Sequence, residues 1–419
     1  MDFLEFLNKS VTPYHTVECL RQILAPAGDK IRLFERGGAL IAVRPPQTVG
    51  EESRFKIALA HTDYPTLKIS PNPDSSAAGV RTLHPEIYGS PLFTSWLDRD
   101  LGYAGLLAFE QNGKVQTKLV RGDKLFRIPQ LAVHLNRGVN QGGLIVNPQT
   151  DMDILWTAMG GHEHFEEALR GSLPDGARLL DFDIQLFDAQ PAQYGGFEDE
   201  WVYSGRLDNL SSCHAIVEAF ATAEPSERDF LVAAFFNNEE VGSTTREGAA
   251  GNFLKSVLDS IVSFGYSRMT CHPGAEGDRV QELASVPNLA GVLSSSFALS
   301  IDMAHACHPS FKDKHEDNHA PVLGGGIVLK TNSQKRYASD VCSSAQFRLL
   351  CEQSNIPYQT FVSRNDMPCG STVGPTVSAS LGIPTVDIGE PMLSMHSIRE
   401  MTAKKDHQGM IALVSAFYL

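Results

Sequence analysis

A run of seven apolar residues, Phe230–Phe236, leads directly into the segment NNEEVGS and strongly constrains the fold of this 419-residue chain. Polar residues do not interrupt the run, so it predicts a strand that is buried on both faces. Such strands are typical of a parallel sheet that helices cover on each side. In open sheets of this kind, ligands bind beyond the carboxyl ends of the strands. Glu239 and Glu240 follow the run and occupy the position where such a site would form.

Strand and helix patterns alternate along the second half of the chain. Residues 204–220 have the apolar spacing of a helix, and the buried run follows them. The pattern continues through a strand, a helix and two further strands, namely FALSIDM, SSAQFRLLCEQSN, YQTFVS and PTVDIG. Near the start, Thr12-Pro13 marks the first turn of a helix, and residues 55–65 form a short buried strand. This alternation predicts an α/β fold with a mostly parallel sheet.

The α/β pattern is interrupted after its first strands. Residues 71–92 are rich in proline, glycine and serine, and the next hundred residues contain short β-like pieces with frequent turn residues. This pattern is typical of a separate β-rich domain. We therefore expect one α/β domain that carries an inserted β-rich domain.

Composition excludes several classes of protein. The formal net charge of −14 argues against a nucleic-acid partner, because such partners are held by neutralising phosphates. No apolar stretch approaches the roughly 20 residues of a membrane helix, and the N-terminus has no signal-peptide pattern. The seven cysteines are dispersed and form no CxxC pair, which favours reduced thiols. We expect a cytoplasmic protein that binds neither nucleic acid nor membranes.

Six potential metal ligands stand at the ends of the predicted strands and helices. Each alone is more simply explained as a cap or a hydrogen-bonded core residue. Together, two histidines and four carboxylates suit Zn, Mn or Co. Without cations the carboxylates would repel one another, so we expect two divalent ions about 3.5–4 Å apart that share one carboxylate. The six residues are His61, Asp208, Glu239, Glu240, Asp302 and His396.

The adjacent glutamates suggest a division of roles. In extended chain, neighbouring side chains point to opposite sides. One glutamate can then hold a metal while the other stays outside the coordination sphere and carries a proton as general base and acid. The spacing alone leaves open which glutamate has which role.

Eleven segments, in order along nearly the whole chain, resemble the M18 family of metallo-aminopeptidases, the aspartyl aminopeptidases. They are TPYHTVE, HTDYP, SWLDRDLGYAG, RIPQLAVHLNR, GRLDNL, FNNEEVGS, SIDMAHACHPSF, KHEDNHAP, NSQKRYAS, RNDMPCGSTVGP and MHSIREM. The resemblance implies a dinuclear exopeptidase, most often with zinc, that releases N-terminal Asp or Glu from peptides with a free N-terminus.

The resemblance also implies roles for the clustered side chains. It makes Glu239 the general base, and Asp63 the carboxylate that orients a histidine ligand. Tyr64 stands where the family usually has serine, which affects the pocket edge and leaves the ligands intact. The implied ligands are two terminal histidines, one bridging aspartate and two further carboxylates: His61 and His396, Asp208, and Glu240 and Asp302.

The resemblance divides the chain into three segments. Residues 1–72 and 199–419 would form the catalytic domain, and residues 73–198 the inserted β-rich domain. That insertion would pack subunits into dimers and then into larger homo-oligomers, commonly dodecamers. His134 resembles a histidine that reaches into a neighbouring subunit's active site; the alternative is an ordinary loop or helix-face histidine.

Four further residues are candidates for binding substrate. His305 and His319 resemble residues that line the family's substrate site, and Gly370 lies in the segment CGSTVGP, which would shape the pocket. Lys330 aligns with a lysine suited to an acidic substrate side chain; the alternative is a solvated lysine. The HEDNH segment also fits the HExxH zinc pattern. The proline and glycines that follow it make the required helix improbable.

Two alternatives to an acid-specific aminopeptidase stay open. One is an aminopeptidase that prefers neutral or hydrophobic N-terminal residues, because the assignment of Lys330 rests on one position. The other is a non-catalytic assembly protein with a vestigial metal site. The complete ligand set argues against the second.

Overall fold

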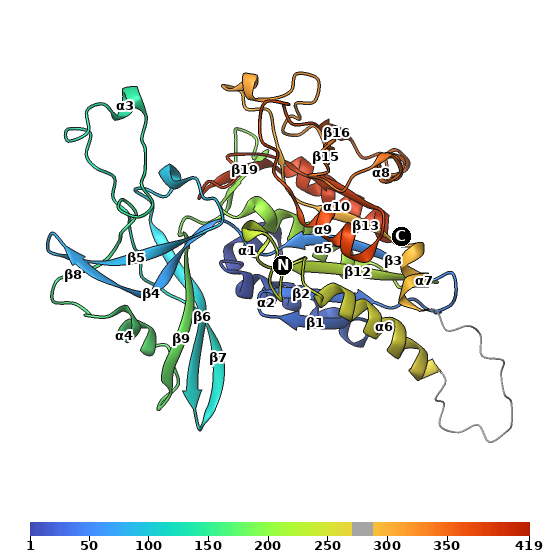
Figure 1. The fold of residues 1–419 in the computed structure, drawn as a ribbon, viewed down its shortest axis with the longest axis horizontal. Helices are drawn as coiled ribbons and strands as arrows, with labels where there is room; N and C mark the ends of the chain where they lie inside the picture. The colour runs from blue at the N-terminus through green and yellow to red at the C-terminus, as the bar shows by residue number, and fades with distance from the viewer. Residues whose placement is uncertain (270–287) are drawn as a thin grey trace.

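The structure is a computed structural model that describes residues 1–269 and 288–419, so Cys271, one of the predicted free thiols, lies outside it. Its centre is an eight-stranded sheet (Figure 1). Four neighbouring strands, β12, β3, β13 and β17, run parallel, which confirms the mostly parallel prediction. The strand order is β1 (Arg32–Arg36), β2 (Ala39–Arg44), β12 (Asp229–Phe236), β3 (Arg54–His61), β13 (Phe297–Ile301), β17 (Thr385–Gly389), β15 (Ile327–Lys330) and β16 (Tyr358–Phe361).

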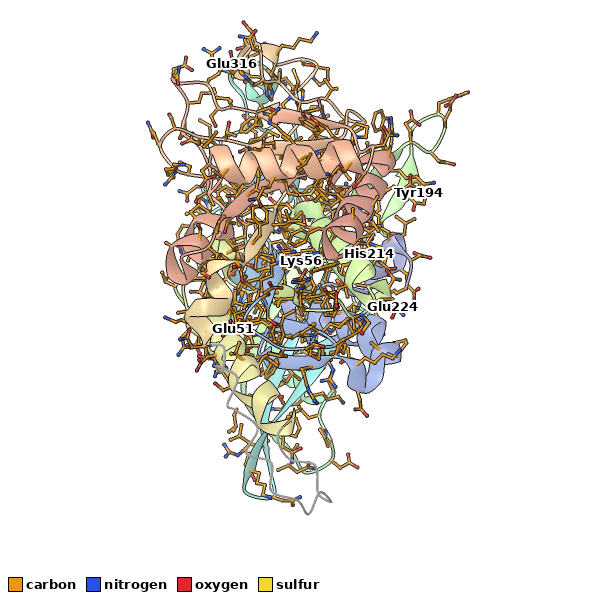
Figure 2. All side chains as sticks on the ribbon, turned by 90° about the vertical axis from the view of Figure 1, so that its right-hand side faces the viewer. Glu51, Lys56, Tyr194, His214, Glu224 and Glu316 are labelled. Atoms are coloured by element: carbon orange, nitrogen blue, oxygen red, sulfur yellow. The ribbon has the colours of Figure 1, made fainter. Side chains whose placement is uncertain are left out.

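Helices cover both faces of this sheet. One face packs against α1 (Phe3–Lys9), α2 (Pro13–Leu24), α5 (Leu207–Thr222), α8 (Val341–Gln353) and α10 (Lys404–Tyr418). The other packs against α6 (Phe253–Met269), α7 (Leu289–Ser294) and α9 (Val373–Leu381). Side chains fill the space between the layers, and His214 of α5 is one of them (Figure 2).

The two covered faces explain the uninterrupted apolar run of β12. Leu231, Ala233 and Phe235 belong to the core under α5, and the alternate residues belong to the opposite core. Successive strand residues point to opposite faces, so a strand buried on both sides needs apolar residues at every position. The helix predicted from Thr12-Pro13 is also present, because the Thr12 hydroxyl caps α2 by accepting from the backbone N–H of His15.

A second, six-stranded sheet is antiparallel throughout and lies in a separate lobe with the short helices α3 (Val139–Gly142) and α4 (Phe165–Arg170) (Figure 1). The proline- and glycine-rich segment forms most of a long hairpin here, with an irregularity between Ile69 and Asp74. The sheet begins at Thr66, and the boundaries at 73 and 198 stay predictions. The strand order is β7 (Lys114–Arg121), β6 (Leu101–Gln111), β9 (Arg178–Asp188), β4 (Thr66–Ala77), β5 (Val80–Tyr88) and β8 (Ile154–Ala158).

A small third sheet has five short strands, from residues 193–204, 304–305 and 391–403. Its order is β10 (Gln193–Gly195), β11 (Trp201–Ser204), β19 (Glu400–Ala403), β18 (Pro391–Leu393) and β14 (Ala304–His305). The remaining short 3-10 turns are η1 (Ala25–Lys30), η2 (Phe93–Ser95), η3 (Glu239–Val241) and η4 (Lys312–Lys314). Within residues 1–269 and 288–419, every helix is too short or too polar to cross a membrane.

Candidate metal centre and peptide site

The five predicted ligands and Glu239 meet at the carboxyl edge of the eight-stranded sheet. His61 ends β3, Asp302 directly follows β13, and the two glutamates follow β12. Because these strands run parallel, their carboxyl ends lie at one edge. Asp208 enters from the first turn of α5, where the peptide bond that follows it is cis, and His396 enters from the loop between β18 and β19.

The backbone at the two glutamates differs from the prediction. The expectation of extended chain is wrong, because Glu239 and Glu240 open the 3-10 turn η3. Asn238 precedes them in the left-handed region, with φ of 64°, and turns the chain at the end of β12. The N–H groups of both glutamates donate to the carboxylate of Asp63, each at 3.1 Å. A turn, rather than a strand, brings both side chains to the cluster.

The cluster consists of two groups that share Asp208. In the first, His61 Nε2 lies 3.5 Å from Asp208 Oδ1 and 3.5 Å from Asp302 Oδ1. In the second, His396 Nε2 lies 3.5 Å from Asp208 Oδ2 and 3.4 Å from Glu240 Oε1. Each oxygen of Asp208 therefore faces a different histidine, which is the arrangement that a bridging carboxylate requires.

Glu239 reaches the same cluster without belonging to either group. Its carboxylate, that of Glu240 and the ring of His61 bring ligand atoms within 4.8 Å of one another. Burial raises the pKa of Glu239 to about 7, and the charges of Asp302, Asp63 and Asp208 add to this effect. A carboxylate with a pKa near neutrality is suited to accept and return a proton.

The electrostatics of the cluster call for positive charge. Burial opposes ionisation of Asp208, yet the imidazoles of His396 and His61 hold its pKa well below the usual range. Burial also opposes a charge on His396, but Asp208 and Glu240 raise its pKa to about 10. The carboxylates outnumber the histidines, and their negative charge keeps the imidazole of His396 protonated.

The donor set fits divalent metal ions. Asp208 Oδ1 is buried and has no hydrogen-bond partner among residues 1–269 and 288–419, although buried polar atoms are normally paired. Imidazole nitrogens and carboxylate oxygens are the ligands that Zn, Mn and Co accept. The unpaired oxygen and the excess of carboxylates both favour a cation at this position.

Two further carboxylates hold the ligands in place. The Asp63 carbonyl lies 3.0 Å from His61 Nδ1 and its carboxylate 3.4 Å away, and the carboxylate also accepts from both glutamate N–H groups. Sequence reasoning missed Glu400, which accepts from the backbone N–H of Asp208 at 3.1 Å and of His396 at 2.7 Å. Burial and the charge of Asp208 raise the pKa of Glu400 to about 8. Its one sequence signal is its place in MHSIREM, four residues after a ligand.

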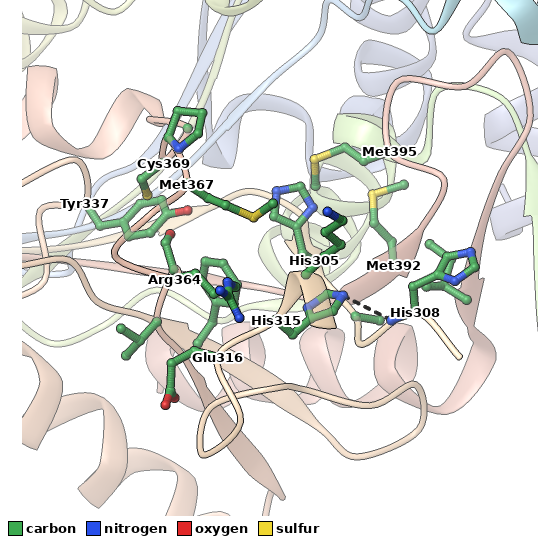
Figure 3. Close-up of a pocket in the computed structure, with 18 of the residues that line it drawn as sticks. His305, His308, His315, Glu316, Tyr337, Arg364, Met367, Cys369, Met392 and Met395 are labelled. Carbon is green, nitrogen blue, oxygen red and sulfur yellow. Dashed lines mark hydrogen bonds between the residues drawn. The ribbon is translucent and has the colours of Figure 1, made fainter. Parts of the chain in front are cut away.

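A cavity of about 300 Å³ is lined in part by Tyr337 (Figure 3). The centre of the Tyr337 ring lies 5.3 Å from the ammonium of Lys330, which in turn lies 3.8 Å from Asp302 Oδ2 of the cluster. The lining of the cavity also includes His305, three residues after Asp302, and Met395, which directly precedes His396. The wall combines apolar side chains with basic ones, and Glu316 is the acidic residue among those that line it.

The predicted substrate-binding residues divide into three groups. His305 and Gly370 line the cavity. Lys330 does not line it but lies buried beside the cluster, where its ammonium donates to the Met303 carbonyl at 3.1 Å and lies 3.8 Å from Asp302 Oδ2. His319 instead contacts Glu316, and His134 is exposed on a loop of the six-stranded lobe.

The HEDNH segment does not form a zincin helix. Residues 315–319 form a turn after η4, and α-helix is absent from this described segment. His315 accepts from the backbone N–H of His308, while His319 contacts Glu316 three residues before it. The two histidines therefore face different partners, as the weak helix signals predicted.

Comparison with known proteins identifies the family. The model of the Peptidase_M18 family, described as aminopeptidase I zinc metalloprotease, matches residues 6–418. A probable M18 family aminopeptidase 2 from Pseudomonas aeruginosa is 39% identical, over 99% of this chain and 96% of the relative. Ape4, solved in complex with Nbr1, has a TM-score of 0.88 and 32% identity, over 100% of this chain and 84% of that one. The mApe1 dodecamer of S. cerevisiae has a TM-score of 0.80 and 26% identity, over 99% and 95%.

The helix-covered sheet and the histidine–carboxylate cluster at its edge define a metal-dependent hydrolase of the α/β class. The chain belongs to the M18 family, and it is an aminopeptidase, an enzyme that hydrolyses peptide bonds from the N-terminal end.

Proposed function

We propose that the chain is a dinuclear-metal aminopeptidase that releases N-terminal Asp or Glu from peptides. The observation that carries the proposal is the pair of ligand groups that share Asp208, with 3.4–3.5 Å between neighbouring ligand atoms. His61 and Asp302 would complete one metal site, and His396 and Glu240 the other. Zinc is the expected metal, and Mn or Co would also suit these ligands.

Glu239 would carry the proton during hydrolysis. Two divalent ions bound here supply Lewis acidity and lower the pKa of water to about 7. Glu239 would take a proton from the attacking water and return it to the leaving amine. The buried environment that raises its pKa to about 7 supports this role, because the same group must accept and then donate.

Charges around the cavity support the preference for acidic side chains. Lys314 and Arg364 line the cavity, and an acidic side chain next to the carboxylate cluster needs such cations to offset repulsion. Arg364 pairs with Asp366 through Nε and Nη2, at 2.9 and 2.7 Å, which leaves Nη1 for a ligand. Lys330 would act from the cluster side of the cavity, beside the ring of Tyr337.

The same chain would work as a cytoplasmic homo-oligomer. A dodecamer built from dimers is the expected assembly, by analogy with the yeast relative. The exposed position of His134 supports its predicted reach into a neighbouring subunit. Six free cysteines in the described part of the chain support a reducing compartment.

A second candidate substrate class has its own observation. Phe361, Met392 and Met395 line the same cavity, and such apolar walls suit neutral or hydrophobic N-terminal residues. The two candidates share one mechanism and differ in the charge of the residue that is released.

The test is hydrolysis of matched Asp-, Glu- and Leu-terminated peptides, before and after removal of metal by chelator and after zinc is added back. We expect metal-restored release of Asp or Glu, at least tenfold faster than Leu. Arg364→Gln and Lys330→Met should each reduce the rate of Asp or Glu release relative to that of Leu. Arg170→Gln, a surface control in α4, should leave this relative rate unchanged. Preferred release of Leu would establish the second candidate, and no release under any condition would support a non-catalytic assembly protein.

A further inference from the structure

The first observation concerns a tyrosine of the six-stranded lobe. Tyr88, the last residue of β5, donates from its hydroxyl to Asp63 Oδ2 at 2.7 Å. The same hydroxyl accepts from the side-chain amide of Asn238 at 2.9 Å. Asp63 is the carboxylate that lies beside His61 and holds the N–H groups of η3. Tyr88 therefore completes the hydrogen bonding of one group that supports the metal centre.

The second observation concerns the residues that follow β5. The backbone carbonyl of Ser90 accepts from His396 Nδ1 at 3.0 Å, and the N–H of Leu92 donates to the carbonyl of His396 at 2.9 Å. Farther along, Ser95 Oγ accepts from the N–H of Ile398 at 3.0 Å. The imidazole and the backbone of His396 are thus held by the same short segment.

Gly89 allows this segment to approach the cluster. Its φ is +69°, in the left-handed region that side chains rarely adopt. A Cβ built there would lie 3.1 Å from the Cβ of Glu240 and 3.3 Å from the Cα of Pro65. The conformation therefore favours glycine, and a larger side chain would press on Glu240 and Pro65.

The segment itself is anchored to the lobe. Tyr88 pairs with Thr66 across the β4–β5 ladder, and Lys68 Nζ lies 4.9 Å from the centre of the Tyr88 ring. Lys68 also forms an ion pair with Asp183 of β9, at 2.9 Å. The position of the tyrosine is thus fixed by three neighbouring strands.

From these contacts we infer that residues 88–92, which we name the β5 clamp, position the ligands of both metal sites within their own chain. The inference rests on the proposed dinuclear function. Hydrogen bonds to the second nitrogen or to the supporting carboxylate fix a histidine ligand's orientation and tautomer. Tyr88 acts through Asp63 on the His61 site, and the Ser90 carbonyl acts on the His396 site. The lobe predicted to join subunits then also completes the metal centre.

The test of Tyr88 is the Tyr88→Phe variant of the full chain. This change removes one hydroxyl and keeps the ring, so the packing against Lys68 stays. Zinc affinity is measured by competition with a chelator of known affinity, and kcat and KM are measured on one peptide. We expect about tenfold weaker binding of one of the two ions, at the low end for such supporting groups, and a lower kcat with little change in KM. Tyr103→Phe is the control, because its hydroxyl has no hydrogen-bond partner within residues 1–269 and 288–419.

The test of the His396 side is Gly89→Ala, for which we expect loss of one ion per chain. Gly79→Ala is its matched control: Gly79 has φ of +81° in the same hairpin, but a Cβ there meets nothing within 4 Å. Wild-type zinc affinity in both Tyr88→Phe and Gly89→Ala would overturn the inference, and so would failure of both variants to fold. If the wild-type protein itself binds no zinc, the proposed function fails instead.

Discussion

Helix α5 contributes to two clusters of histidine and carboxylate side chains. The two clusters differ in how fully hydrogen bonds and charges balance within each of them. Asp208, in the first turn of α5, belongs to the metal cluster. One turn later begins a second cluster, the α5 network, which consists of Ser211, His214, Glu390 and His407. All four residues of the α5 network are buried, and so are His61, Asp208 and Asp302 of the metal cluster, so burial of such side chains does not by itself mark a metal site.

The α5 network is closed by its own hydrogen bonds. Glu390 accepts from Ser211 at 2.8 Å and contacts His407 Nδ1 at 3.0 Å, and the second nitrogen of His407 lies 3.0 Å from His214. The ring of Phe3 stacks on His407 with 3.7 Å between centroids. Glu390 contacts His407, and Glu218 lies 3.7 Å from His214 Nε2, so each carboxylate faces a histidine and none is left for an ion.

The metal cluster has the opposite balance. Four carboxylates face two histidines, and a buried oxygen of Asp208 has no hydrogen-bond partner within residues 1–269 and 288–419. The comparison teaches which features identify a site that requires a cation. They are excess negative charge and a buried carboxylate oxygen without a hydrogen bond, rather than the mere presence of histidine and glutamate.

The largest expected effect is that of Asp208→Asn. The amide cannot offer an anionic oxygen to each site, so both ions should bind far more weakly and hydrolysis should fall below detection. Metal content per chain, measured by elemental analysis after dialysis, checks this. Full retention of two ions would contradict the bridging role.

Glu239→Gln should reduce kcat by about 10²–10⁴-fold, the usual contribution of a general base, while both ions stay bound. Glutamine keeps the size of the side chain but cannot accept the proton. Steady-state hydrolysis and metal analysis on one preparation separate the two roles. Wild-type-like activity would remove Glu239 from the mechanism.

Ser211→Ala should leave metal content and kcat unchanged and lower the free energy of unfolding by about 1–3 kcal/mol. The reason is that Glu390 would lose a buried donor. Denaturant unfolding of the metal-loaded protein measures the change. A loss of bound metal in this variant would mean that the two clusters are not independent.

The effects of pH on stability have opposite signs in the two clusters. Burial lowers the pKa of His214 to about 3, so the unfolded chain takes up this proton first and stability falls as the pH drops below about 6.5. In the metal-free protein, carboxylates raise the pKa of His396 to about 10, so its contribution is full below about 6.5 and is lost as the pH rises toward 10.

Thermal unfolding of the metal-free protein across pH measures both effects. His214→Gln should flatten the acid side of the profile alone. Loading with zinc should remove the alkaline loss, because the ions replace the proton on His396. If stability is still lost at alkaline pH after the protein is loaded with zinc, the ions do not replace the proton on His396.

The sequence was sufficient to predict the features that depend on local pattern. The uninterrupted apolar run of β12 required a sheet covered on both faces, and strand ends placed His61 and Asp302 at one edge. Glu400 escaped prediction because its role depends on β19 pairing with β11 and on two backbone N–H groups far away in sequence. The turn at Glu239 was not predicted, because extended chain was expected there and the left-handed conformation of Asn238 was not considered.

Tyr88 shows the same limit from another direction. Its segment reads as part of a separate β-rich domain, and nothing in its spacing points to the ligands. Only the fold brings its hydroxyl to Asp63 and the next residues to His396. Contacts between segments about 300 residues apart, such as Ser90 with His396, follow from the closure of the lobe on the sheet.

The most direct test of the central claim is a zinc titration of the chelator-treated protein, with release of Asp from an Asp-terminated peptide as the readout. The shared carboxylate predicts that activity returns fully at two zinc ions per chain, and that the Asp208→Asn variant stays inactive at any ratio. Full recovery at one zinc ion per chain, or activity without added metal, would contradict a centre built on Asp208 as a bridge.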